Sequence, residues 1–113
     1  MAGGNLLKAQ LKFTQLVVEL IRWSYINGYD LTLGEAFRTP EQAQWNADHG
    51  MGIVNSQHTK RLAIDLNLFQ NNVYQTGCEA YRPLGDYWKT LDPACRWGGD
   101  FKRKDGVHFE LVE

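Results

Sequence analysis

Two of the three histidines and two of the aspartates are spaced along the sequence in a way that could support catalysis. His58 precedes Asp65 by seven positions, and Asp105 precedes His108 by three. The imidazoles of His58 and His108 with the carboxylate of Asp65 would form a three-ligand zinc site whose fourth position stays open for water. An open position distinguishes catalytic zinc from structural zinc. We therefore predict one Zn²⁺ per chain at these three residues, provided that the fold brings them together.

Asp105 would lie close to such a metal without being required as a ligand. A carboxylate there could take a proton from the water at the open position and pass it to a leaving amine. Zinc assists by lowering the pKa of its water to about 7. The alternative for Asp105 is a purely structural role, because Asp105-Gly106 is also a good hairpin turn. Glu110 is either a solvated strand residue or, if Asp105 is not the base, the next candidate for it.

Alternating apolar side chains predict the two strands that must carry the ligands. Residues 62–69 place leucine or isoleucine at every second position, so Asp65 points to the opposite, non-core face. Residues 107–112 alternate in the same way, with His108 and Glu110 pointing outward. If the two strands are neighbours in one sheet, the ligands converge over one face. The charge of Asp65 within an apolar strand also requires a partner.

The remaining elements are predicted from helical spacing, caps and turn residues. Apolar side chains between Leu6 and Tyr25 recur with helical spacing, and Thr39-Pro40 is a strong helix start. The other predicted elements are a short strand at 31–33, a hairpin return at 73–74, a helix at 79–90 and a strand at 95–97. Helices come first and strands cluster later, which favours an α+β fold with a small antiparallel sheet packed against helices. The length suits a single domain, residues 1–113.

Composition excludes several classes of partner. The net charge of −1 provides no basic field to hold nucleic acid or an anionic membrane, and the one basic run, Lys102-Arg103-Lys104, is interpreted as a solvated turn. No apolar stretch approaches the roughly 20 residues needed to span a bilayer. No signal peptide is visible, so we expect a cytoplasmic chain as synthesised. Cys78 and Cys95 match no thiolate zinc pattern; a single bridge is geometrically possible, but free thiols are expected.

Four segments resemble, in order, a known family of peptidases. Residues 56–65 resemble the S-x-H-x-x-x-x-A-x-D motif of the zinc D-Ala-D-Ala carboxypeptidases and L-alanyl-D-glutamate endopeptidases. Residues 105–108 resemble their second motif, with an acidic residue three before the last zinc ligand. Residues 37–42 are similar to their aromatic-Arg-Thr-Pro-Glu-Gln segment, and residues 97–101 to the Trp-Gly-Gly stretch of bacteriophage endolysins in this group. Arg61 stands where the family commonly has glycine, which predicts a different loop conformation.

The resemblance implies roles for individual side chains. By it, zinc is bound by His58, Asp65 and His108, and Asp105 is the catalytic acid/base. Arg38 would bind the substrate or stabilise the oxyanion, because its guanidinium offers forked donors; a surface charge at a helix start is the alternative. Ser56 would be a secondary substrate-binding residue. Trp97 would either line the cleft and bind substrate or fill the core.

The same resemblance implies a hedgehog/DD-peptidase fold and a zinc metallopeptidase that hydrolyses an amide bond in peptidoglycan stem peptides. The endolysin-like flanks favour an L-alanyl-D-glutamate endopeptidase, acting as a monomer on the cell wall after holin-assisted release. A D-Ala-D-Ala carboxypeptidase and a non-catalytic cell-wall-binding module that retains the fold stay open as alternatives. Neither a nucleic-acid partner nor membrane insertion is expected.

Overall fold

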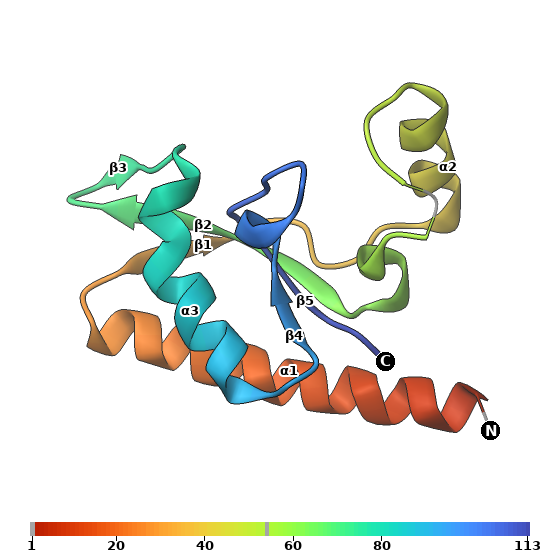
Figure 1. The fold of residues 1–113 in the computed structure, drawn as a ribbon, viewed down its shortest axis with the longest axis horizontal. Coiled ribbons are helices and arrows are strands. Elements are labelled where there is room, and N and C mark those ends of the chain that lie inside the picture. The colour runs from red at the N-terminus through yellow and green to blue at the C-terminus, as the bar shows by residue number, and fades with distance from the viewer. Residues whose placement is uncertain (1, 54) are drawn as a thin grey trace.

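The chain folds as a sheet of short strands with a long helix running along one face (Figure 1). The computed structural model describes residues 2–53 and 55–113. Its α-helices are α1 (Ala2–Ile26), α2 (Pro40–Asp48) and α3 (Arg82–Leu91). Its strands are β1 (Asp30–Leu33), β2 (Ala63–Gln70), β3 (Val73–Tyr74), β4 (Cys95–Trp97) and β5 (His108–Leu111). Three 3-10 helices complete the list: η1 (Gln57–Lys60), η2 (Cys78–Tyr81) and η3 (Gly98–Asp100). The predicted α+β fold class is confirmed.

Every strand pairing in the sheet is antiparallel, and the order is β1-β2-β5-β4 with β3 added to β2. The long β2 is shared between two neighbours. Its second half pairs with β1, and its first half pairs with β5. The register of the β2–β5 pair sets Asp65 directly opposite His108. The predicted adjacency of the two ligand-bearing strands is therefore present in the fold.

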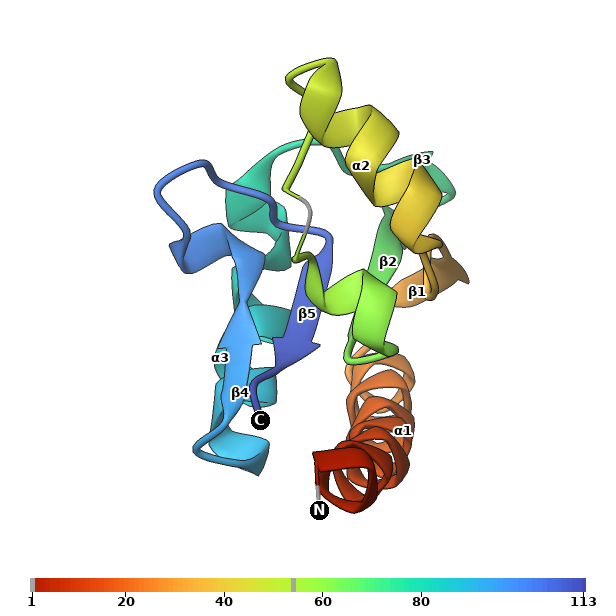
Figure 2. The ribbon, with the colours of Figure 1, turned by 90° about the vertical axis from the view of Figure 1, so that its right-hand side faces the viewer.

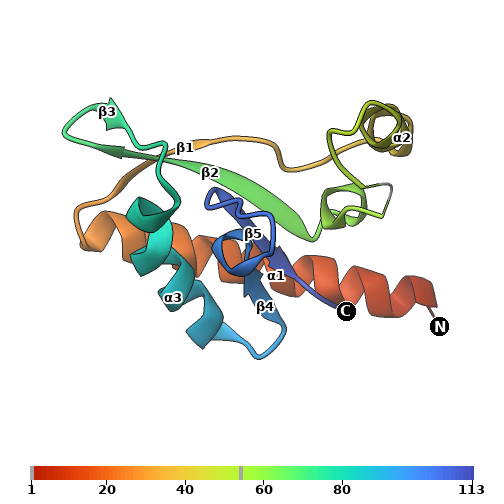
Figure 3. The same cartoon turned by 45° about the horizontal axis from the view of Figure 1, so that its top comes forward.

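The hydrophobic core fills the space between the sheet and the helices α1 and α3, which lie on the same face of β2 (Figure 3). Trp88 of α3 is central to this core. Its ring contacts Phe13 of α1 and Phe109 of β5 edge to face, with centroids 5.8 and 6.2 Å apart. The buried indole N–H donates to the backbone carbonyls of Arg96 and Glu110. This packing fixes the sheet against α3 and leaves the other face available for a site.

Helix α1 presents only one side to the core. Phe13, Val17 and Leu20 are buried and lie three or four positions apart, whereas the other faces are largely exposed. The helix ends where predicted, because Gly28 adopts a φ of 83° and lets Tyr29 N–H bond back to the Ser24 carbonyl at 2.8 Å. Within the two described ranges, no helix combines the length and apolar character that a membrane crossing requires.

Helix α2 lies apart from the core, separated from α1 by the sheet (Figure 2). It begins at the predicted cap: the Thr39 hydroxyl accepts a hydrogen bond from Gln42 N–H at 3.1 Å, and Pro40 occupies the first turn. Of its residues only Ala43 is buried. Consequently, α2 contributes little to the core and instead forms one side of the region above the sheet.

Two residues near the outer face of the sheet bear on the sequence-based expectations. Of the two alternatives for Glu110, a solvated strand residue is excluded: all four residues of β5 are buried, and Glu110 is 4% exposed. Arg61, for which a different loop conformation is predicted, is the C-cap of η1. It takes up φ 58° and ψ 36°, the left-handed conformation that glycine adopts most easily, and its guanidinium stacks 4.0 Å from the Phe37 ring.

Candidate metal centre and cleft

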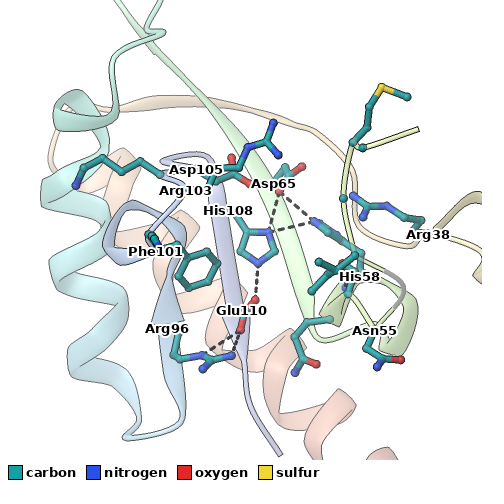
Figure 4. A pocket seen from close by; sticks show the side chains of 18 residues that line it. Arg38, Asn55, His58, Asp65, Arg96, Phe101, Arg103, Asp105, His108 and Glu110 are labelled. Atoms are coloured by element: carbon teal, nitrogen blue, oxygen red, sulfur yellow. Dashed lines mark hydrogen bonds and ion pairs between the residues drawn. The ribbon is translucent and has the colours of Figure 1, made fainter. Parts of the chain in front are cut away.

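The side chains of His58, Asp65 and His108 meet on the outer face of the sheet (Figure 4). Nε2 of His58 lies 3.2 Å from Nδ1 of His108. Oδ1 of Asp65 lies 3.2 Å from the first of these nitrogens and 3.4 Å from the second. Ligand atoms about 2.0–2.1 Å from a tetrahedral zinc ion are separated by about 3.3 Å. The triangle therefore has the dimensions of three ligands around one ion.

The chemistry of the triangle also fits a cation. Oδ1 of Asp65 is a buried oxygen that finds no hydrogen-bond partner among the residues that the structure describes, and both imidazoles are buried. Burial opposes ionisation of Asp65, but its contacts with His108 and His58 outweigh burial and hold its pKa well below the usual range. An ionised, buried carboxylate is costly unless it is paired or coordinates a metal. A cation bound between the three atoms would satisfy it.

Local backbone contacts hold Asp65 in place. Its N–H donates to the Glu35 carbonyl and its own carbonyl accepts from Gly34 N–H, both at 2.8 Å. A Cβ at Gly34 would lie 3.0 Å from the Asp65 Cβ and carbonyl oxygen. The close approach of this segment to β2 therefore depends on glycine at position 34.

His58 is positioned by the 3-10 helix η1. Ser56 caps this helix, because its hydroxyl accepts a hydrogen bond from His58 N–H at 3.2 Å. On the ring itself, Nδ1 lies 3.3 Å from the carbonyl oxygen of Ala36, which leaves Nε2 directed at the other ligands. Ser56 lines the cavity, but its hydrogen bond gives it a positioning contact with His58 in addition to any contact with substrate.

Glu110 and Arg96 support His108 from behind, and the sequence analysis did not identify this arrangement. Nε2 of His108 donates to Glu110 Oε1 at 2.6 Å, so the lone pair of Nδ1 faces the triangle. Arg96, opposite Glu110 in the β4–β5 register, donates to Oε2 at 2.6 and 3.1 Å. Burial disfavours the ionised form of Glu110, but the bonds to His108 and Arg96 prevail and lower its pKa. The sequence does contain a signal for the contact between His108 and Glu110, because residues two positions apart lie on the same face of a strand.

Asp105 lies on the turn that enters β5, and Figure 4 shows it beside Asp65. Its N–H donates to the Gly98 carbonyl at 2.9 Å, and its carbonyl accepts from His108 N–H at 3.1 Å. A Cβ at Gly98 would lie 2.1 Å from the Asp105 carbonyl oxygen, so only glycine allows this approach. Partial burial, followed by the nearby charge of Asp65, raises the pKa of the Asp105 carboxyl. Asp105 is thus accessible from the cleft and more basic than an ordinary aspartate.

Trp97 does not line the cleft. Its side chain is fully buried in the core, which corrects the prediction that it binds substrate and supports the alternative that it fills the core. It still influences the site, because the indole N–H donates to the Gly106 carbonyl at 2.8 Å and so anchors the turn that carries Asp105. Gly85 and Gly99 pack against the ring, each where a Cβ would lie 2.2 Å from it.

Arg38 reaches the site from the segment before α2. Its guanidinium is bound by Glu35, through Nε at 3.2 Å and through Nη2. Glu35, which the sequence analysis did not select, also places Oε1 3.7 Å from Nε2 of His58. The side chain of Arg38 is therefore held next to the metal centre instead of moving freely as a surface charge.

A cavity of about 860 Å³ opens above the metal centre. We call it the cleft, and its floor consists of the three triangle residues with Glu110. One bank is formed by Arg38 and residues 50–53 and 55–57, and the other by Arg96 and residues 101–105. The cleft contains all of the predicted site residues except Trp97.

The model of one protein family, described as D-alanyl-D-alanine carboxypeptidase, matches residues 49–111. This segment includes the metal triangle and Asp105, and it amounts to more than half of the chain. No curated protein matches the sequence at a significant level. Arg38 and its partner Glu35 lie outside the matched segment.

Three solved structures are similar in fold. The L-Ala D-Glu endopeptidase ChiX of Serratia marcescens matches with a TM-score of 0.76 and 20% sequence identity, over 89% of this chain and 78% of that chain. A mutant of the vancomycin resistance D,D-pentapeptidase VanY from the VanB-type cassette, in complex with Zn(II), matches with a TM-score of 0.63 and 17% identity, over 90% and 71%. VanYB in complex with D-alanine-D-alanine gives a TM-score of 0.63 and 18% identity, over 90% and 70%.

Proposed function

The chain belongs to the D-alanyl-D-alanine carboxypeptidase family of peptidases, and from this premise we propose that it is a zinc endopeptidase that cleaves the L-Ala–D-Glu bond of peptidoglycan stem peptides. The observation that carries the proposal is the metal triangle, whose three ligand atoms lie 3.2–3.4 Å apart beneath an open cleft. Two nitrogens and one carboxylate oxygen suit Zn²⁺ and leave one position of a tetrahedron free.

The residues of the chain suggest how hydrolysis would proceed. When bound by the triangle, zinc would polarise the scissile carbonyl and acidify the attacking water. Asp105 would accept a proton from the attacking water and return it to the leaving amine. Arg38, held by Glu35, donates hydrogen bonds to an oxygen of the substrate. Glu110 keeps His108 in the tautomer that presents Nδ1.

The choice of an endopeptidase is supported by two observations. ChiX, an L-Ala D-Glu endopeptidase, matches the chain with a TM-score of 0.76. The segment at 97–101 also resembles that of bacteriophage endolysins, for which release to the cell wall with the help of a holin is the expected route. The family description and the likeness to VanYB favour a second candidate, a D-Ala-D-Ala carboxypeptidase.

Digestion of purified peptidoglycan tests the proposal. The zinc-loaded protein should produce new amino termini on D-glutamate, detected by mass spectrometry, and the Asp105→Asn variant should produce about a hundredfold fewer. Release of free D-alanine without new glutamate termini would replace the endopeptidase with the carboxypeptidase. Retention of the protein on peptidoglycan without any cleavage would instead indicate a binding module.

A further inference from the structure

The basic run at residues 102–104 is part of the cleft. Lys102, Arg103 and Lys104 are exposed, as expected of the solvated turn predicted from the sequence, and all three also line the cavity, immediately before Asp105. Lys104 donates to the Gly99 carbonyl at 3.3 Å and so helps to shape the turn. Figure 4 shows Arg103 beside Asp105, with Arg38 on the other side of the metal triangle.

Of the three carboxylates that line the cleft, Glu110 and Asp65 already have partners, whereas Asp105 forms no ion pair with any residue that the structure describes. Glu110 is bound by Arg96 and His108, and Asp65 belongs to the metal triangle. Arg38 is neutralised by Glu35. Among residues 2–53 and 55–113, no carboxylate lies within ion-pair distance of Lys102 or Arg103, whereas eleven such contacts are found elsewhere. The positive charge of this bank is therefore directed at the cleft and its solvent.

This local charge contrasts with the chain as a whole, which carries a net charge of −1. Among the described residues that line the cleft, five are cationic and three are carboxylates. A cleft with an excess of one sign of charge concentrates ligands of the opposite sign. The guanidinium of Arg103 has the forked geometry that binds a carboxylate through two parallel hydrogen bonds, and it stays protonated at all relevant pH values. Lys102 adds a second, flexible cation beside it.

We propose that Arg103, assisted by Lys102, forms a subsite that binds a carboxylate of the substrate, so that the preferred peptide is acidic next to the bond that is cleaved. The inference rests on the proposed function for the identity of the peptide. A stem peptide offers this chemistry in two places, the free carboxylate of an internal glutamate and the carboxylate at its C-terminus. Occupation by the first would fit an endopeptidase, and occupation by the second a carboxypeptidase.

Peptide binding tests the subsite independently of catalysis. The zinc-loaded Asp105→Asn variant is titrated calorimetrically with three acetylated L-Ala-D-Glu-L-Lys peptides: one with both carboxylates free, one amidated at glutamate and one amidated at the C-terminus. We expect amidation at one of the two places to raise Kd about tenfold, the usual scale of a charge-assisted bidentate contact. Adding Arg103→Gln should raise Kd for the free peptide to the same degree and abolish the difference between acid and amide.

A matched control removes an exposed arginine outside the cleft. Arg22→Gln on α1, in the same Asp105→Asn background, should leave all three Kd values unchanged. Three results would overturn the subsite. In the first, Arg103→Gln leaves the ratio of Kd between amidated and free peptides as it is in the Asp105→Asn protein. In the others, Arg103→Gln weakens the binding of all three peptides equally, or none of the peptides binds. Carboxylate-dependent binding without cleavage of peptidoglycan by the wild type would reject only the proposed function. Cleavage without any effect of Arg103 on the ratio would reject only the subsite.

Discussion

Asp105 is the residue on which catalysis is expected to depend most directly. Asp105→Asn preserves the shape of the side chain and the backbone bonds of the turn but removes the proton acceptor. Loss of a general acid/base slows a reaction by roughly 10²–10⁴-fold, so we expect kcat on stem peptides to fall at least about a hundredfold while zinc content stays near one equivalent. Normal cleavage by this variant would reduce Asp105 to a turn residue, and loss of zinc would make it a ligand.

Glu110 should control how tightly the metal binds. Its bond to Nε2 of His108 fixes the tautomer and orientation of a ligand, and removing such a partner typically costs 10–100-fold in metal affinity. We expect about a tenfold weaker zinc affinity in Glu110→Gln, measured by competition with a chromophoric chelator. Glu113→Gln, which removes only the exposed ion pair with Lys60, provides the control and should keep the wild-type affinity.

Cys95 makes stability depend on pH under alkaline conditions. Burial in the core raises the pKa of its thiol to about 12, whereas the pKa of a cysteine thiol in an unfolded chain is about 8.5. Between these values the unfolded chain loses a proton that the folded chain keeps, so the free energy of unfolding falls as the pH rises above about 9. Denaturant unfolding under reducing conditions should show a shallower fall for Cys95→Ala than for the wild type. Identical slopes would contradict this.

The elements that carry the ligands could be predicted because alternation specifies faces. The pattern of β2 placed Asp65 opposite the core, and the structure pairs it with His108. Alternation does not report which partners a side chain meets on the outer face, which is why a solvated Glu110 stayed open as an alternative. The contact of Trp97 with the Asp105 turn was equally invisible, since it depends on where η3 folds back over β5. Sequence patterns thus identified the strands and the triangle but not the supporting contacts.

The junction of β4, η3 and the Asp105 turn depends on glycine. In Gly98→Ala the added methyl would overlap the Asp105 carbonyl and approach the His108 Cβ to 2.9 Å, so the turn must move. Overpacking of this kind costs about 1–3 kcal/mol, and we expect that loss in denaturant unfolding, together with reduced peptidase activity. Gly4→Ala on α1 meets no atom within 4 Å and should stabilise the protein by up to about 1 kcal/mol. Equal behaviour of the two variants would contradict the close approach.

For the molecule as a whole, the metal is expected to stabilise the fold by cross-linking segments that are distant in sequence. Its ligands come from positions 58, 65 and 108, on η1, β2 and β5. With free zinc at about 100 times Kd, binding adds about 2.7 kcal/mol to the stability of the folded state, which corresponds to about 10 °C in Tm for a chain of this size. Calorimetry with and without chelator should show this shift, and the His58→Ala, His108→Ala double variant should show none.

The position of β5 in the sheet has a consequence for the time course of folding. β5 separates β2 from β4, yet both of those strands leave the ribosome before it. A nascent chain that ends before residue 108 therefore has two strands whose shared neighbour does not yet exist, and it lacks one metal ligand. Strand pairings between distant parts of a chain form slowly because their loops must close first. Assembly of the central sheet and acquisition of hydrolytic competence thus become a single event, which cannot occur before β5 has been synthesised.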